Sequence, residues 1–171
     1  MGTFKHSIIR VSTPTLTAEC IDTGFDFEGC HGSVFLRNEL YCYFIDGTFS
    51  KIYNIDSSPL RTYLATIMNE KLLNFALTGY TLTTESHIFL TGGSGKNASF
   101  PIVAVYHVDR DYWSLGPRLN FNRERHSSCI LGDKLYVSGS AMYELDTIEV
   151  ANCSELINYD KEYYIDGSHP W

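Results

Sequence analysis

The sequence predicts an all-β fold built from a repeated unit of four antiparallel strands, and three observations support this. First, the 171-residue chain contains twelve Tyr, ten Phe and two Trp, and aromatic side chains fit the half-buried surface of a sheet. Second, three segments share the order strand, polar turn, strand, and they recur at a steady spacing. Third, an aromatic residue follows an Asp-led turn after each of the first two segments.

Three short polar turns separate paired apolar runs, which is typical of β-hairpins. The turns are Arg37-Asn38-Glu39, Glu85-Ser86-His87 and Gly132-Asp133-Lys134. The strands after them start at Leu40, Ile88 and Leu135, at spacings of 48 and 47 residues. Such a period indicates a repeat architecture, because one small sheet cannot bury both of its faces alone.

A further strand is predicted after each hairpin. Residues 52–56 and 105–109 share the pattern apolar, Tyr, polar, apolar, Asp, and the aromatic residues Tyr63 and Trp113 follow them. Asp suits a turn because its side chain bonds nearby backbone N–H groups. The third copy, at 147–152, lacks the Tyr and a nearby Trp. One unit is therefore predicted to contain a hairpin, a strand that ends at the Asp, and a strand that carries the aromatic residue.

The stretch from 62 to 77 allows two interpretations. Apolar residues recur there at helical spacing, which allows a helix over 62–77: Leu64, Ile67, Met68, Leu72 and Phe75. The repeat favours a strand near Tyr63–Ile67, a turn at 69–71 and a strand from Leu73.

The copy from Tyr80 to Arg118 resembles the kelch repeat. It has a glycine pair, a Tyr, an Asp and a Trp in that family's order: Gly92, Gly93, Tyr106, Asp109 and Trp113. The outer copies depart from the pattern, with Ile45-Asp46-Gly47 and Ser138-Gly139-Ser140 where the glycine pair belongs. The resemblance implies one domain over 1–171, with units at approximately 28–68, 72–118 and 122–160. These units would form a partial or small β-propeller of four-stranded blades, incomplete at both ends, which invites self-association to complete it.

The resemblance further implies a protein–protein interaction module that binds its partner through the loops between strands and between blades. Arg125 matches a family position that points toward the binding face, and Arg123 and Arg118 lie near it. A guanidinium can grip a carboxylate with two parallel hydrogen bonds, so the expected partner segment is an acidic peptide. Local pairing of Arg125 with Glu124 or Asp133 is the competing interpretation.

Composition argues against several other classes. The net charge of −7 disfavours a nucleic-acid partner, and no apolar run is long enough to span a membrane. The five cysteines contain no C-x-x-C, and the six histidines have no zinc-site spacing. We therefore expect no metal, no cofactor and no catalytic residue. Without a secretory signal in 1–10, we expect reduced thiols in a cytoplasmic protein.

Two alternatives remain open from the sequence. One is an enzyme on a propeller scaffold, of oxidase or glycosidase type, for which the sequence offers residue types such as Tyr41-Cys42-Tyr43 but no matching arrangement. The other is a truncated gene product without independent function, which the short length and the divergent outer copies favour.

Overall fold

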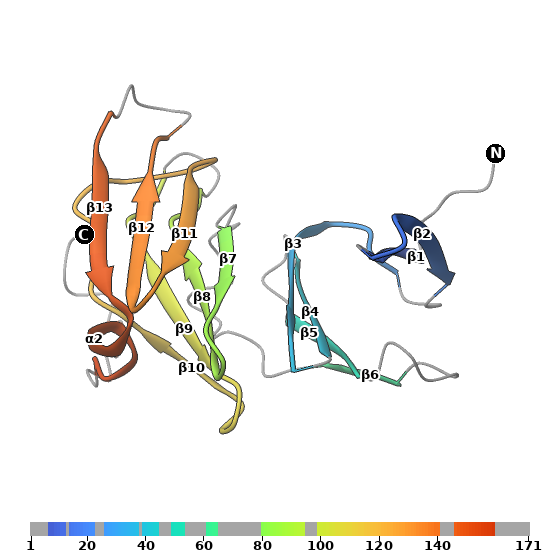
Figure 1. Ribbon diagram of the computed structural model, residues 1–171. Coiled ribbons are helices and arrows are strands. Elements are labelled where there is room, and N and C mark those ends of the chain that lie inside the picture. The colour runs from blue at the N-terminus through green and yellow to red at the C-terminus, as the bar shows by residue number, and fades with distance from the viewer. Residues whose placement is uncertain are drawn as a thin grey trace.

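The computed structural model describes residues 7–12, 14–22, 26–37, 39–44, 49–53, 61–64, 80–94, 99–140 and 146–159 (Figure 1). The strands are β1 (Ser7–Ser12), β2 (Thr17–Asp22), β3 (Cys30–Leu36), β4 (Glu39–Phe44), β5 (Phe49–Tyr53), β6 (Arg61–Leu64), β7 (Tyr80–Thr83), β8 (His87–Thr91), β9 (Val103–His107), β10 (Tyr112–Leu115), β11 (Ser127–Leu131), β12 (Lys134–Ser138) and β13 (Ile148–Asn152). A short helix, α2 (Cys153–Ile157), follows β13. The predicted all-β class is confirmed.

The strands form antiparallel sheets in which neighbours in sequence are neighbours in space. We name them the first sheet (β3–β6), the second sheet (β7–β10) and the third sheet (β11–β13). The strands β1 and β2 pair separately as a hairpin, which lies outside the predicted repeat units. Each of the three sheets lies within one of the predicted units. The hairpins form at the predicted turns, because each turn is only a few residues long and its strands are adjacent in sequence.

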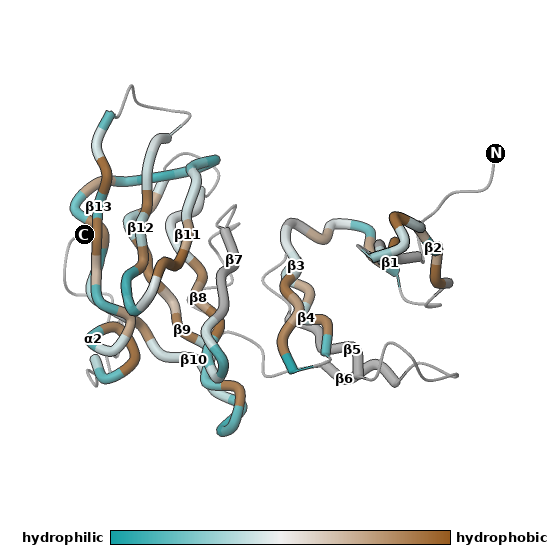
Figure 2. The backbone as a smooth tube through the Cα atoms, viewed as in Figure 1, coloured by the Kyte–Doolittle hydropathy of each residue, from teal (hydrophilic) through white to brown (hydrophobic). Residues whose placement is uncertain are grey.

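The second sheet is buried on both faces. Side chains alternate between the two faces of a strand, so Ile88 and Leu90 of β8 face the first sheet while Phe89 faces the third. Strand β9 divides in the same way, with Ala104 facing the first sheet and Val105 the third. Figure 2 shows the resulting hydrophobic stretches along these strands. A strand buried on both faces has a continuous apolar run, which explains the sequence of β9.

The first strands of the three sheets lie next to one another. Strand β7 contacts both β3 and β11, and Figure 1 shows the second sheet between the other two. Tyr106 joins the first and second sheets, since its ring meets Tyr41 edge-on at a centroid distance of 6.0 Å. Trp113 packs beside Tyr106 at 5.1 Å. Two landmarks of the repeat therefore fill the space between these sheets.

In the third sheet, α2 follows β13 where the repeat predicts a fourth strand. Cys153 and Leu156, three residues apart on one face of α2, are buried against the core between the second and third sheets. The Cys153 N–H donates to the Asp133 carbonyl at 2.8 Å. One face of α2 therefore packs against this end of the core. The described residues contain no helix that is both long enough and apolar enough to cross a membrane.

Part of the ambiguous stretch can be compared with the structure. Arg61–Leu64 forms β6, which agrees with the start of the predicted strand near Tyr63. Residues 65–79 lie outside the described residues, so neither the predicted helix nor the predicted strand from Leu73 is tested there.

Candidate functional site

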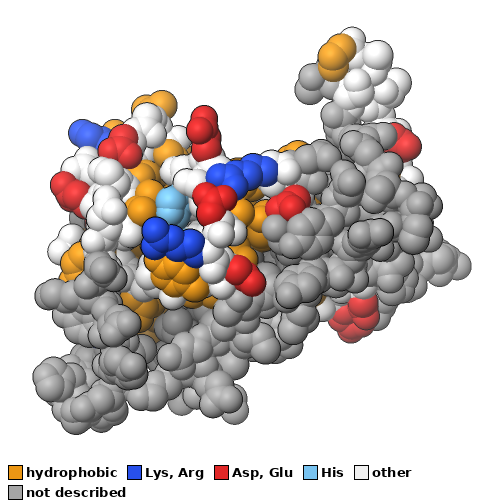
Figure 3. All heavy atoms as spheres, turned by 90° about the horizontal axis from the view of Figure 1, so that it is seen from below, with side chains coloured by type: hydrophobic (Ala, Val, Ile, Leu, Met, Phe, Trp, Pro, Cys, Tyr) orange, Lys and Arg blue, Asp and Glu red, His pale blue; other side chains and the backbone are white. Residues whose placement is uncertain are grey.

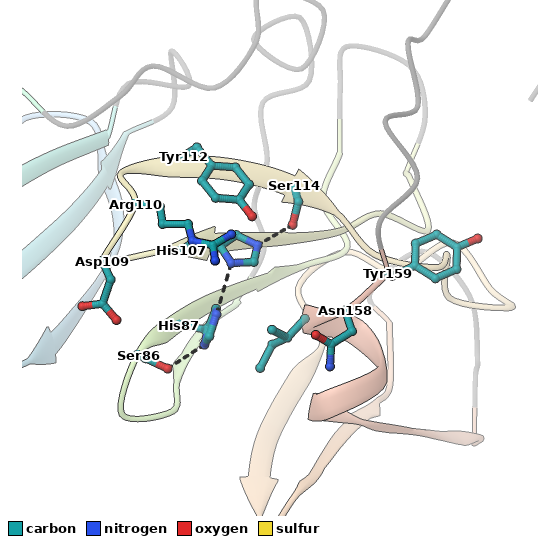
Figure 4. Close-up of a pocket in the computed structure, with 10 residues that line it drawn as sticks. Ser86, His87, His107, Asp109, Arg110, Tyr112, Ser114, Asn158 and Tyr159 are labelled. Atoms are coloured by element: carbon teal, nitrogen blue, oxygen red, sulfur yellow. Dashed lines mark hydrogen bonds between the residues drawn. The ribbon is translucent and has the colours of Figure 1, made fainter.

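A cavity of about 440 Å³ opens at one end of the second sheet. The β7–β8 turn and the β9–β10 turn form one side of it, and the end of α2 forms the other (Figure 4). It is lined by Ser86, His87, His107, Asp109, Arg110, Tyr112, Ser114, Ile157, Asn158 and Tyr159. Figure 3 views the molecule from this end, where a histidine lies among basic, acidic and hydrophobic side chains.

Strand register brings the aromatic side chains of the cavity together. His87 begins β8 and His107 ends β9, and the two residues are direct partners across the ladder. His107 is in turn the partner of Tyr112 on β10. Residues that pair across antiparallel strands present their side chains on the same face. The three residues therefore form one row across three strands.

A chain of hydrogen bonds runs through the two imidazoles. The Ser86 hydroxyl meets His87 Nδ1 at 2.8 Å, and His87 Nε2 meets His107 Nδ1 at 3.1 Å. His107 Nε2 then meets the Ser114 hydroxyl at 2.8 Å. Only one of the two facing ring nitrogens carries a hydrogen, so the arrangement requires at least one neutral ring. The Tyr112 ring stacks on His107 at 4.2 Å and presents a flat aromatic surface.

Burial holds both histidines in the neutral form. Burial is the largest cause that lowers the pKa of His87, and the nearby Asp109 carboxylate partly opposes this lowering. Burial also lowers the pKa of His107, and the neighbouring His87 and Arg110 lower it further. At neutral pH the two histidines are therefore uncharged, and their ring nitrogens are bonded to each other and to Ser86 and Ser114.

The rim of the cavity carries two arginines in different states. Arg37 pairs with Asp109, and its Nε also donates to the Glu85 carbonyl at 2.8 Å. The hydrogen bond from Arg37 is the largest cause of the lowered pKa of Asp109. Arg110 is exposed, and its guanidinium has no hydrogen bond to another described residue. Among the described residues that line the cavity, Arg110 is therefore the cation available to a ligand.

The three arginines predicted to bind a partner lie at the other end of the sheets. They belong to the connection between β10 and β11, whereas the cavity lies at the turns after β7 and β9. In an up-and-down sheet these connections are at opposite ends. Arg118 and Arg125 are exposed, and the Arg125 side chain pairs with neither Glu124 nor Asp133.

Arg123, which the sequence predicts to contact a partner, is buried in this structure, with a side chain that is 0% exposed. Its Nε donates to Glu149 Oε1 at 2.8 Å and its Nη1 to the Gly139 carbonyl at 2.9 Å. Its Nη2 donates to Thr147 Oγ1 at 2.8 Å. The guanidinium is thus fully engaged in joining the connection between the second and third sheets to β13.

The glycine pair also has a structural position. Gly92 and Gly93 both have positive φ, and the Gly93 N–H donates to the Arg123 carbonyl at 2.8 Å. His126 lies beside them, with Nε2 at 2.8 Å from Thr91 Oγ1. Burial, assisted by Arg123, lowers the pKa of His126 to about 4. This cluster therefore holds the connection against the end of β8.

Metal and thiol chemistry can be checked in the same residues. The described residues contain no group of three or more His, Cys, Asp or Glu side chains that could hold a metal ion. All five cysteines lie in the described part of the chain, and each is a free thiol.

Sequence reasoning missed the cavity because it weighed each histidine separately. The signal was present in the repeat: His87 starts the second strand of a unit and His107 lies near the end of the third. Strands that are joined in an antiparallel sheet place such residues opposite each other. Searches against models of known protein families and against curated proteins found no match.

Proposed function

We propose that this chain is part of a kelch-type β-propeller and acts as a protein-interaction module. The observation that carries the proposal is the arrangement of the three sheets. They follow one strand order, their second strands start 48 and 47 residues apart, and their first strands are adjacent. In a propeller, sheets arranged around a common axis bury both faces and leave only short edges, and the adjacent first strands support such an arrangement.

The surface that suits a partner best is the cavity end. It is built from the β7–β8 and β9–β10 turns and from the end of α2, which follows the third sheet. Connections of this kind between strands and sheets are where binding residues concentrate. Arg110 supplies an available cation, and the stacked His107 and Tyr112 supply an aromatic wall. An acidic side chain of a bound peptide would pair with Arg110 while its neighbour packs on Tyr112.

Arg110→Ala is expected to weaken peptide binding by about tenfold or more, since one charge-assisted hydrogen bond contributes roughly 1.5–3 kcal/mol. A phage-displayed library of random peptides, panned on the whole chain, supplies the probe. Acidic peptides should be enriched, and fluorescence polarisation then gives their affinity for each variant.

Arg125→Ala is the matched control, because it removes an exposed arginine at the opposite end and should leave the affinity unchanged. If Arg125→Ala weakens binding and Arg110→Ala does not, the binding face is the one that the sequence predicted. A selection without acidic peptides would contradict the proposed ligand class.

The outer face of the third sheet fits the same proposal. Leu131, Ile148 and Val150 are 72%, 66% and 52% exposed. Tyr136 pairs with Cys129 on one side and with Val150 on the other, so these three side chains lie on the same face of the sheet. The other face of this sheet packs on the second sheet. Because the same kind of sheet-on-sheet contact would continue outward, a second copy of this chain is the occupant that we propose for this face.

We expect the unaltered chain to self-associate in concentration-dependent light scattering, and we expect Ile148→Lys to abolish that self-association. A charge placed in an apolar interface loses its hydration, so the associated form is disfavoured. Ile9→Lys is the control, because Ile9 is 71% exposed and lies on the separate β1–β2 hairpin. This variant should associate as the unaltered chain does. A chain that stays monomeric at every concentration, or equal behaviour of both variants, would overturn this interface.

A further inference from the structure

We propose that Cys30 and Cys42 form a peroxide-sensitive thiol pair, in which hydrogen peroxide oxidises Cys30 first and Cys42 then closes a disulfide. This inference concerns the first sheet and does not depend on the proposed binding function. It rests on how the sheet places the two sulfurs and on which of them can react.

A β-bulge places the two cysteines on one face of neighbouring strands. Cys30 pairs with Phe44, whereas Ser33 pairs with Cys42, and the register shifts between Cys30 and Gly32. Residues two apart on β4 share a face, so Phe44 and Cys42 lie together and Cys30 is a diagonal neighbour of Cys42. The extra residue in β3 keeps Cys30 on that face.

The packing confirms that the side chains meet. Cys42 and Phe44 form a buried cluster, and the partly buried Cys30 packs against it together with Phe27 and Leu40. Cys42 is fully buried, whereas Cys30 remains partly accessible to solvent. A small oxidant therefore reaches Cys30 before it reaches Cys42.

Hydrogen bonding selects Cys30 as the thiolate. The interaction with the Cys42 side chain is the largest cause that lowers the pKa of Cys30 to about 7, and the protonated Cys30 thiol donates to the Gly32 carbonyl at 3.3 Å. Burial opposes this, and the backbone groups of Gly32 and Tyr43 lower the pKa further. The pKa of Cys42 is raised by its interaction with Cys30 and by burial. Of the two thiols, Cys30 therefore loses its proton more readily, and Cys42 keeps its proton.

The chemistry follows in two balanced steps. The Cys30 thiolate attacks one peroxide oxygen, an S–O bond forms, the O–O bond breaks, and the hydroxide that leaves becomes water on taking a proton. The Cys42 sulfur then attacks the Cys30 sulfenic acid, an S–S bond forms, the S–O bond breaks, and a second water leaves with the Cys42 proton. Two thiols are oxidised and one peroxide is reduced to two waters.

The test treats the whole reduced chain with hydrogen peroxide, blocks the remaining thiols by alkylation and maps the peptides by mass spectrometry. We expect a linked Cys30–Cys42 pair to appear before any oxidation of the exposed Cys20 and Cys129. In Cys42→Ala, the sulfenic acid at Cys30 should persist and be trapped by dimedone, because the resolving thiol is gone.

Cys20→Ser and Cys129→Ser are the matched controls, and each should form the Cys30–Cys42 disulfide as the unaltered chain does. Oxidation that begins at Cys20 or Cys129, with Cys30 and Cys42 still alkylated, would overturn the proposal. The unaltered chain alone decides this outcome, so the result does not depend on whether Cys42→Ala folds normally.

Discussion

Gly92→Ala is expected to lower the free energy of unfolding by about 2–5 kcal/mol. A φ of +63° at Gly92 costs an L residue roughly 1–2 kcal/mol, and overpacking adds roughly 1–3 kcal/mol. The new Cβ would lie 2.5 Å from His126 Cε1 and would also clash with the Arg123 carbonyl oxygen. That oxygen accepts the Gly93 N–H, so relieving the clash disturbs the contact between β8 and the connection to the third sheet. Urea unfolding followed by circular dichroism measures the loss.

Gly132→Ala separates the two causes. Gly132 has a φ of +62°, nearly that of Gly92, but a Cβ there meets nothing within 4 Å. We expect a loss of about 1–2 kcal/mol, from backbone conformation alone. Equal losses in the two variants would show that the crowding around Gly92 has no energetic effect.

Arg123→Ala is expected to lower the free energy of unfolding by about 3–5 kcal/mol, because it removes the buried cation that pairs with Glu149 and leaves two backbone carbonyls without the guanidinium donor. The Glu149 carboxylate keeps its hydrogen bonds from Asn120. Arg123→Lys should lose less, since it keeps the charge, but a single ammonium cannot replace a planar fork of donors. Chemical denaturation of each variant gives the free energies.

Two further variants sharpen this prediction. Arg125→Ala, two residues along the same connection, should change the free energy of unfolding by no more than about 0.5 kcal/mol, because its side chain is exposed. Adding Glu149→Gln to Arg123→Ala should recover part of the loss by removing the uncompensated charge, and a double-mutant cycle measures that coupling. Independent, additive losses would contradict a direct Arg123–Glu149 interaction.

The candidate site could have been predicted only in part. Its position at the strand ends follows from the repeat, and the His87–His107 pairing follows from the register of β8 and β9. The far wall could not be predicted, because the repeat gives no indication of the helix α2 directly after β13. The packing of Cys153 and Leu156 into the core is a tertiary contact that stabilises this helix.

The sequence alone determined the features that depend on short stretches of chain. Alternation, aromatic content and compact polar turns are local properties, so the hairpins of the three sheets and their spacing follow from them. The role of Arg123 was decided by tertiary structure. Its partners Gly139, Thr147 and Glu149 lie 16 to 26 residues away, and no local pattern distinguishes it from the exposed Arg125. Whether a charged side chain faces solvent or a buried carboxylate depends on which strands fold over it, and that is set by contacts between distant segments.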